Sequence, residues 1–200
     1  MEENTEIIND FSEQPSENNS EKKSGGIAFV YEVASIFVTA LVIIAVLFTF
    51  FVRFVGVDGS SMVPTLHDGD WLVVSAINTK ITQGDIVIST QPNAFNEPIV
   101  KRVIAKGGQT VDIDFTDGIV YVDGQALDEK YIAAPTHTRE GITFPITVPE
   151  GKLFLMGDNR NDSTDSRSPL VGCVDERYIL GVVKCRATPN FKIFKATSHN

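Results

Sequence analysis

Residues 85–122 read DIVISTQPNAFNEPIVKRVIAKGGQTVDIDFTDGIVYV. The segment consists of short runs rich in Val and Ile, with Gly, Asp or Asn between them, and such runs are typical of β-strands. The runs are Asp85–Thr90, Ile99–Ala105, Thr110–Phe115 and Gly118–Val122. The Asp123-Gly124 pair that follows them is a strong signal for a two-residue turn between antiparallel strands. The segment therefore predicts an all-β domain of antiparallel sheets.

Similar runs lie on both sides of this segment. Trp71–Ile77 precedes it, and the later ones are Phe144–Val148, Lys152–Met156 and Tyr178–Cys185. Between them, Asp128–Gly141 shows no clear periodicity, so we expect a long surface connection there. We assign residues 56–200 to this β-rich domain.

An apolar segment precedes the domain. Val33–Val52 contains no charged residue, and twenty helical residues span a hydrocarbon core of about 30 Å. A buried core helix would carry one apolar stripe, and the apolar region of a cleavable signal peptide is usually shorter, so we predict one transmembrane helix within residues 27–55. Lys22 and Lys23 before the segment outnumber Arg53 after it, which slightly favours a cytoplasmic amino terminus.

The charge of the chain also limits its function. The 200 residues hold 26 acidic and 17 basic side chains, for a net charge of −9, and this sign argues against nucleic-acid binding. Much of the acidity lies in residues 1–26, which have the polar composition of a disordered tail. Cys173 and Cys185 lack the spacing of a structural zinc site, so one disulfide or two free thiols are both compatible with the sequence.

The sequence lacks the motifs of several hydrolase classes: GxxxxGK[ST], HExxH and GxSxG. His67 is the one histidine near a plausible nucleophile, so a Ser-His-Asp triad has little support. A lysine can replace histidine as the base if burial keeps it neutral. Lys101 shares its strand face with Ile99 and Val103, so it either reaches water at a strand edge or lies in a pocket. Ser61 lies in a glycine-flanked loop, which taken alone is an ordinary turn.

Together, four ordered blocks resemble the type I signal peptidases, in a compact form like that of Gram-positive bacteria. Ser61–Thr65 (SMVPT) is similar to the nucleophile motif of that family, and Lys101–Ile104 (KRVI) is similar to its general-base motif. The other two blocks are Gly84–Val87 (GDIV) and the segment from Gly157-Asp158-Asn159-Arg160 to Ser163-Thr164-Asp165-Ser166-Arg167.

This resemblance implies a role for each matched residue. Ser61 would be the nucleophile, Lys101 its general base, and Ser163 the serine that orients the lysine. The remaining matches would brace the loop beside the site: Asp158, Asp165 and Arg167. The resemblance implies no metal and no cofactor.

Two details refine the assignment. Some family members carry an oxyanion-binding serine two positions before the nucleophile, where this chain has Gly59, so backbone N–H groups including that of Ser61 would bind the oxyanion. The alternatives for the last block are a solvated turn rich in Asp and Asn and a calcium loop. The calcium loop is excluded because Arg160 occupies a position that needs an acid or amide.

The implied function is that of a membrane-bound serine endopeptidase that removes signal peptides from secretory preproteins, cutting after small residues through an acyl-enzyme. The protein would be anchored in the cell membrane by one helix, with an extracytoplasmic catalytic domain. This domain would contact the lipid bilayer, and the secretion translocon would be a further partner. A self-cleaving repressor-type protease would carry a DNA-binding domain instead of the apolar segment, and an inactive relative would lack Ser61 or Lys101. The alternative from another class is a membrane-tethered β domain that binds a partner without catalysis.

Overall fold

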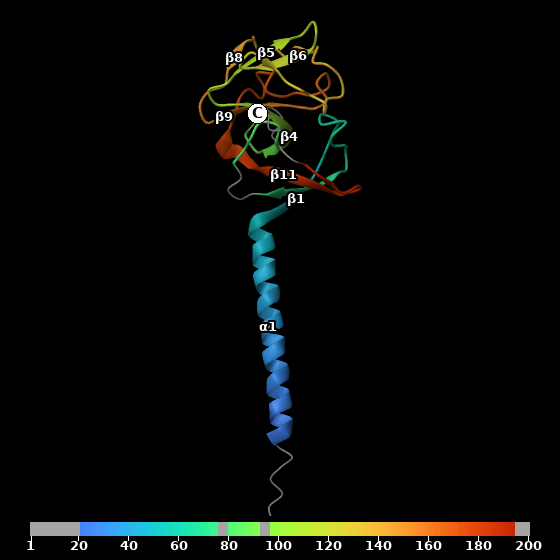
Figure 1. The fold of residues 1–200 in the computed structure, drawn as a ribbon, viewed down its shortest axis with the longest axis vertical. Helices are drawn as coiled ribbons and strands as arrows, with labels where there is room; N and C mark the ends of the chain where they lie inside the picture. Colours follow the sequence, from blue (N-terminus) through green and yellow to red (C-terminus); the bar gives the residue numbers. More distant parts are fainter. Residues whose placement is uncertain (1–20, 76–79, 93–96, 195–200) are drawn as a thin grey trace, which may run out of the picture. The chain divides into compact units, whose positions relative to one another are not determined.

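The computed structural model describes residues 21–75, 80–92 and 97–194, and the chain divides into two compact units between Val46 and Leu47. The described part of the first unit belongs to the helix α1, Glu21–Phe51 (Figure 1). Its stretch Ala28–Val46 has 19 residues, a mean hydropathy of 2.4 and no burial within the protein. Among the described residues it is the one helix long and apolar enough to cross a membrane.

The helix has different ends from those expected for the membrane segment. It begins at Glu21, so residues 21–26 of the expected tail are helical, while residues 1–20 lie outside the described residues. It ends at Phe51, and Val52–Gly56 form the strand β1, which pairs with Ser75–Trp71 along its whole length. Val and Phe suit a strand as well as an apolar helix, so pairing with a neighbouring strand decides the conformation here.

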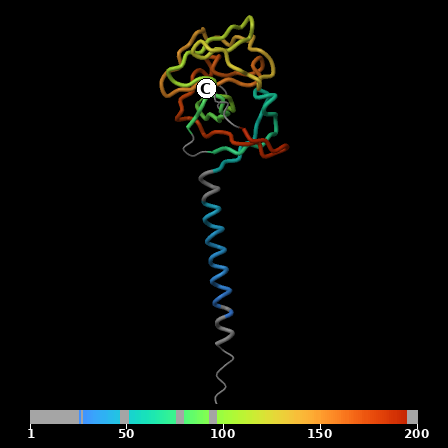
Figure 2. Tube along the Cα trace, in the orientation of Figure 1, coloured from blue at the N-terminus to red at the C-terminus, as the bar shows by residue number. Residues whose placement is uncertain are grey.

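The larger sheet of the second unit has eight strands, in the order β1-β2-β11-β3-β4-β9-β10, with β12 paired to β11. The further strands are β2 Trp71–Ser75, β3 Ile86–Ser89, β4 Ile99–Lys106, β9 Lys152–Met156, β10 Val174–Asp175, β11 Ile179–Thr188 and β12 Lys192–Ile193, and the 3₁₀ helix η1 covers Glu176–Tyr178. All pairs are antiparallel. In Figure 2 the teal trace of β1 and β2 lies beside the red trace of β11, so segments far apart in sequence are neighbours.

The smaller sheet has four strands in the order β7-β6-β5-β8, near the top of Figure 1. They are β5 Thr110–Asp114, β6 Ile119–Val122, β7 Gln125–Ala126 and β8 Ile146–Thr147. Asp123 and Gly124 join β6 to β7 with φ angles of 52° and 77°, as the predicted two-residue hairpin requires.

The core explains why β4 is buried on both faces. Ile104 lies in a cluster with Val111 and Val120 of the smaller sheet, whereas Val103 packs in a second cluster that includes Val87. Lys101 therefore lies on a strand with protein on both sides. This burial positions the site described below.

The predicted fold class is confirmed, and most predicted strands are present within a few residues of their expected bounds. Residues 128–141 contain neither helix nor strand, as expected of a connection. The pairing of β6 with β7 corresponds to the predicted hairpin, whereas strands β1, β10 and β12 were not predicted. Cys173 and Cys185 are both free, which corresponds to the thiol alternative.

Candidate active site

Ser61 and Lys101 lie in direct contact. The Nζ atom of Lys101 is 2.7 Å from the Oγ atom of Ser61, within hydrogen-bond distance. Lys101 lies on β4 opposite Val87 of β3 and is only 4% exposed. Its side chain thus does not reach water at a strand edge, and the pocket alternative is the one that the structure shows.

The surroundings of Lys101 act on its charge in opposite directions. Burial has the largest effect and lowers the pKa of the Lys101 ammonium, because a charged group loses its hydration there. The carboxylates of Asp165 and Glu140 raise this pKa, Arg167 lowers it, and Asp158 raises it. The net direction is downward, so Lys101 becomes a neutral proton acceptor at a lower pH than an exposed lysine.

The loop that contains Ser61 is fixed by the burial of two of its apolar side chains and by a backbone hydrogen bond. The neighbouring Met62 and the nearby Leu66 are buried at 2% and 0% exposure in an apolar cluster. Gly59 has a φ of +90°, which favours glycine, and its N–H donates to Asp68 Oδ1 at 3.0 Å. The backbone of Ser61 is therefore fixed although its side chain borders a groove.

A second loop, residues 157–163, closes over the first. The N–H of Asn159 donates to the carbonyl oxygen of Ser61 at 3.0 Å. The Oγ of Ser60 donates to Asp162 at 2.8 Å, so Ser60 is engaged with this loop. Gly157 is required for the close approach, since an added Cβ would lie 2.5 Å from the Ser61 carbonyl oxygen.

Ser163, Asp165 and Arg167 form one buried hydrogen-bonded unit. Asp165 Oδ2 accepts from Ser163 Oγ at 3.0 Å and from the N–H of Gly157 at 2.9 Å. Arg167 donates to both oxygens of Asp165 at 2.8 Å each. Among the described residues, the hydroxyl of Ser163 bonds to Asp165 and the amine of Lys101 bonds to Ser61, with no hydrogen bond between Ser163 and Lys101.

The residue after Lys101 forms another buried ion pair of the site. Arg102 donates to both oxygens of Asp158, at 2.8 and 2.6 Å, and to the carbonyl oxygen of Gly84 at 2.7 Å. The ring of Tyr131 stacks on its guanidinium at 3.9 Å. Arg102 thereby links the block of Gly84 and the block of Asp158 to the strand on which Lys101 lies.

The connection 128–141 contributes residues that the sequence analysis did not single out. Glu129 accepts two hydrogen bonds from Arg160, at 2.8 and 2.5 Å, and Thr136 accepts a third at 3.0 Å. Tyr131 and Glu140 lie against the buried pairs described above. Such contacts join residues far apart in the chain, so no local sequence signal could have revealed them.

A groove of about 550 Å³ lies beside the Ser61–Lys101 pair, lined by residues 55–58 and 97–101 with Ser61, Met62 and Ile88. Two strand edges border it. Among the described strands, β1 pairs with β2 alone, and residues 99–101 of β4 pair with β3 on one side while β9 pairs only from Arg102 onward. An extended peptide could therefore pair with these free edges.

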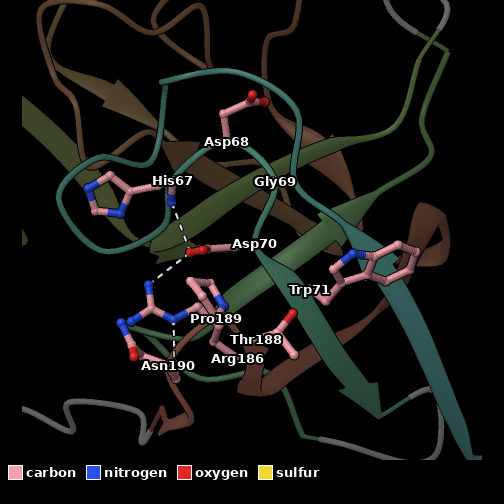
Figure 3. A pocket seen from close by; sticks show the side chains of 9 residues that line it. All are labelled: His67, Asp68, Gly69, Asp70, Trp71, Arg186, Thr188, Pro189 and Asn190. Carbon is pink, nitrogen blue, oxygen red and sulfur yellow. Dashed lines mark hydrogen bonds and ion pairs between the residues drawn. The ribbon is translucent and has the colours of Figure 1, made fainter.

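A second hollow of about 540 Å³ lies elsewhere on the same unit (Figure 3). Arg186 there donates to Asp70 Oδ2 at 2.8 Å and to the carbonyl oxygen of Asn190 at 2.9 Å. His67 lines this hollow and is not among the residues that line the groove of Ser61. The structure thus gives no support to a triad built on His67.

The chain is similar to known proteins over most of its length. The model of the signal peptidase, peptidase S26 family matches residues 30–188. A probable signal peptidase I-1 from Synechocystis sp. is 38% identical over 175 residues, which cover 80% of this chain and 84% of that protein. Signal peptidase I S of Bacillus subtilis is 35% identical over 180 residues, 84% of this chain and 92% of that protein.

A crystal structure of a signal peptidase I from Enterococcus faecalis V583 is 32% identical and aligns over 52% of this chain and 97% of that chain, with a TM-score of 0.42. The family match and the relatives both extend across the two blocks that hold Ser61 and Lys101. This chain belongs to the signal peptidase, peptidase S26 family.

Proposed function

We propose that this protein is a membrane-bound serine endopeptidase that removes amino-terminal signal peptides from exported preproteins. One observation carries the mechanism: the amine of a buried lysine lies 2.7 Å from the hydroxyl of Ser61, beside a groove with free strand edges. The family membership carries the substrate class, because the relatives are named signal peptidases.

The reaction begins with proton transfer within the pair. Neutral Lys101 accepts the proton of Ser61 Oγ while this oxygen attacks the substrate carbonyl, and backbone N–H groups including that of Ser61 stabilise the oxyanion. The Lys101 ammonium then gives its proton to the leaving amine of the mature chain. Water, deprotonated by Lys101, hydrolyses the ester and releases the signal peptide.

The other matched residues act through this pair. Ser163 and Asp165 hold the loop around Gly157 against Ser61, and Arg167 holds Asp165. We propose that Ser163 thereby helps to orient the lysine. Asp158 fixes Arg102 and, through it, the segment of β4 that presents Lys101.

We expect the groove to bind an extended substrate that has small side chains near the cut. A peptide between β1 and residues 99–101 would point alternate side chains towards Val57, Ile88 and the neighbouring apolar residues of the groove. Small residues at the first and third positions before the cut fit such shallow apolar surfaces. Cleavage after Ala-x-Ala is the expected pattern.

The function is tested with the purified full chain in detergent and a preprotein peptide whose signal segment ends in Ala-x-Ala. We expect one cut after the second Ala, identified by the masses of both products, at a rate that rises with pH as Lys101 loses its proton. Replacing both Ala residues by Leu gives the control peptide, which should remain intact. Absence of cleavage by the folded chain would favour the binding-only alternative, which the presence and contact of Ser61 and Lys101 do not favour.

We further propose that α1 crosses the cell membrane once, with a cytoplasmic amino terminus and the β-rich unit outside, where the secretion translocon delivers substrates. In the sequence, β1 begins at Val52, shortly after the apolar stretch Ala28–Val46. Large apolar side chains are exposed on β1, β2 and beside or on β12: Phe54 at 60%, Trp71 at 51%, Phe191 at 69% and Ile193 at 61%. Such a face suits the lipid bilayer.

Trp71 provides a direct test of this lipid contact because it is the single tryptophan of the chain. Figure 3 shows its indole directed away from the Arg186–Asp70 pair. In vesicles of lipids brominated on their acyl chains, we expect weaker Trp71 emission than in the same lipids without bromine, and weak quenching by aqueous iodide. Equal emission in both lipids together with strong iodide quenching would contradict the proposed face.

A further inference from the structure

The peptide group between Ser60 and Ser61 is fixed through its carbonyl oxygen. This oxygen accepts two hydrogen bonds, from the N–H of Val63 at 3.0 Å and from Nδ2 of Asn159 at 3.2 Å. A trans peptide bond is planar, so its C=O and N–H groups point in opposite directions. The two bonds that hold the Ser60 carbonyl group therefore also determine the direction of the Ser61 N–H.

The Ser61 N–H is available to a ligand. Among the described residues, no oxygen atom accepts a hydrogen bond from it. Ser61 and Met62 line the groove beside the catalytic pair, whereas Asn159 is not among the described residues that line it. The N–H thus points away from Asn159, on a residue that borders the groove.

Asn159 also holds the next peptide group along the chain. Its backbone N–H donates to the carbonyl oxygen of Ser61 at 3.0 Å. One residue therefore binds the carbonyl oxygens of both peptide groups that meet at the Cα atom of Ser61. Because the orientations of these two planar groups define φ and ψ, Asn159 fixes the backbone conformation of Ser61.

The carboxamide of Asn159 is itself oriented by its neighbours. Its Nδ2 lies 3.5 Å from Oδ2 of Asp162, the oxygen that accepts the hydroxyl of Ser60 at 2.8 Å. The N–H of Asp162 donates to the carbonyl oxygen of Asn159 at 3.0 Å and closes a turn. Asn159 is half-buried, whereas Ser60 and Asp162 are exposed. These contacts present the Nδ2 group of Asn159 to the Ser60 carbonyl oxygen.

We propose that Asn159 is a positioning residue for the oxyanion, whose side-chain amide turns the Ser61 N–H towards the oxygen on which negative charge develops. This inference rests on the function proposed above and names the residue that orients a donor of the same site. Gly59 has no side chain, and the hydroxyl of Ser60 is engaged with Asp162, so neither provides a side-chain donor. The direction of the backbone N–H is therefore decisive.

The effect should appear in the transition state and not in substrate binding. The tetrahedral intermediate carries a charged oxygen, whose hydrogen bonds are stronger than those of the neutral substrate carbonyl. In Asn159→Ala the Ser60 carbonyl oxygen keeps the N–H of Val63 as its described donor, so the peptide group can tilt. We expect kcat to fall about 10- to 100-fold, with KM changed by less than about twofold.

Two inhibitors separate these states in the full chain in detergent. One is a peptide aldehyde that ends in Ala-x-Ala, and the other is the corresponding alcohol. Ser61 Oγ adds to the aldehyde carbon, its proton passes to Lys101, and the carbonyl electron pair moves to oxygen, which becomes negative as in the reaction. The alcohol cannot react and reports ground-state binding. In Asn159→Ala the inhibition constant of the aldehyde should rise about 10- to 100-fold, and that of the alcohol should stay unchanged.

The matched control is Asn161→Ala, the same substitution two positions later in the same loop. The carboxamide of Asn161 bonds to backbone groups of residues 135–138 at 2.9–3.0 Å, and not to the loop of Ser61. Loosening of the loop alone would therefore affect this variant as well. The ratio of the two inhibition constants should change in Asn159→Ala and not in Asn161→Ala.

Two outcomes would overturn the inference while leaving the proposed function intact. The first is an equal change of this ratio in both variants, which would assign Asn159 a purely structural role. The second is an unchanged ratio in Asn159→Ala while the wild type cleaves its peptide.

A further measurement does not depend on turnover. Serine is labelled with ¹⁵N, and the Ser61 amide signal is assigned by its loss in Ser61→Ala. The order parameter of this amide should be that of rigid backbone, about 0.85, in the wild type and in Asn161→Ala, and lower in Asn159→Ala. An unchanged order parameter in Asn159→Ala overturns the inference even if the wild type cleaves no peptide, in which case the proposed function fails separately.

Discussion

Replacing Lys101 with methionine is expected to lower kcat for signal-peptide cleavage by about 10⁴-fold or more, because the variant has no group that can accept the Ser61 proton. Methionine fills a similar volume without a charge, and the site is only 4% exposed, so the fold should persist. Ser61→Ala should cause a loss of the same size. The measurement is single-turnover cleavage of the Ala-x-Ala peptide, with circular dichroism to verify folding.

The chain offers a matched control on the same strand. Lys106 also lies on β4 and is half-buried, but its Nζ donates to the backbone carbonyl oxygen of Ile81 at 2.8 Å. Lys106→Met should therefore retain cleavage within a few-fold of the wild type.

The double variant Ser61→Ala/Lys101→Met separates a working pair from two independent effects. If the two groups act in one proton transfer, removing both should cost no more than removing either. A double variant that is slower than both single variants by a further factor of about 10³ would contradict the dyad. So would a Lys101→Met variant that cleaves at the wild-type rate.

The strands were predictable where the sequence pattern has a local cause. The Asp123-Gly124 turn and the alternation of Thr110–Asp114, with Val111 and Ile113 buried and Asp112 and Asp114 exposed, follow from pleat and turn chemistry. Strand β1 was not predictable, because its apolar residues continue the composition of α1 and only pairing with β2 distinguishes them. The two-residue strands β10 and β12 likewise depend on their partners.

The site was predictable to the extent that its residues lie in short blocks. The alternation around Lys101 placed it on an apolar face but left open whether that face was covered, and burial was decided by the packing of β4 between two clusters. Glu129, Tyr131 and Glu140 lie in a connection without periodicity, and they meet the site only through long-range contacts with Arg160, Arg102 and Arg167. Such contacts depend on the tertiary fold, so the local sequence contains no pattern that would predict them.

The second large predicted effect is a loss of folding stability when the Arg102–Asp158 pair is broken. Both side chains are nearly inaccessible, at 7% and 0% exposure, and the two hydrogen bonds of 2.8 and 2.6 Å use both carboxylate oxygens. A buried ion pair contributes little net free energy when it is complete, because both charges have lost their hydration. Removing one partner is different, since the other charge then lies in the interior without compensation.

Asp158→Ala is accordingly expected to lower the free energy of unfolding by about 3–5 kcal/mol, because Arg102 would keep only the Gly84 carbonyl oxygen and the Tyr131 ring as partners. Asp158→Asn, which retains one acceptor oxygen, should fall between this variant and the wild type. The control is Asp128→Ala, whose pairing with Lys130 is exposed and should leave the unfolding midpoint unchanged. Urea unfolding of the full chain in detergent measures all three.

Since Arg102 follows Lys101 directly on β4, loosening this pair should also slow cleavage by Asp158→Ala under conditions where the variant remains folded. An Asp158→Ala midpoint equal to that of Asp128→Ala would show that Arg102 finds compensation elsewhere, and the pair could then not be what fixes Lys101 against Ser61.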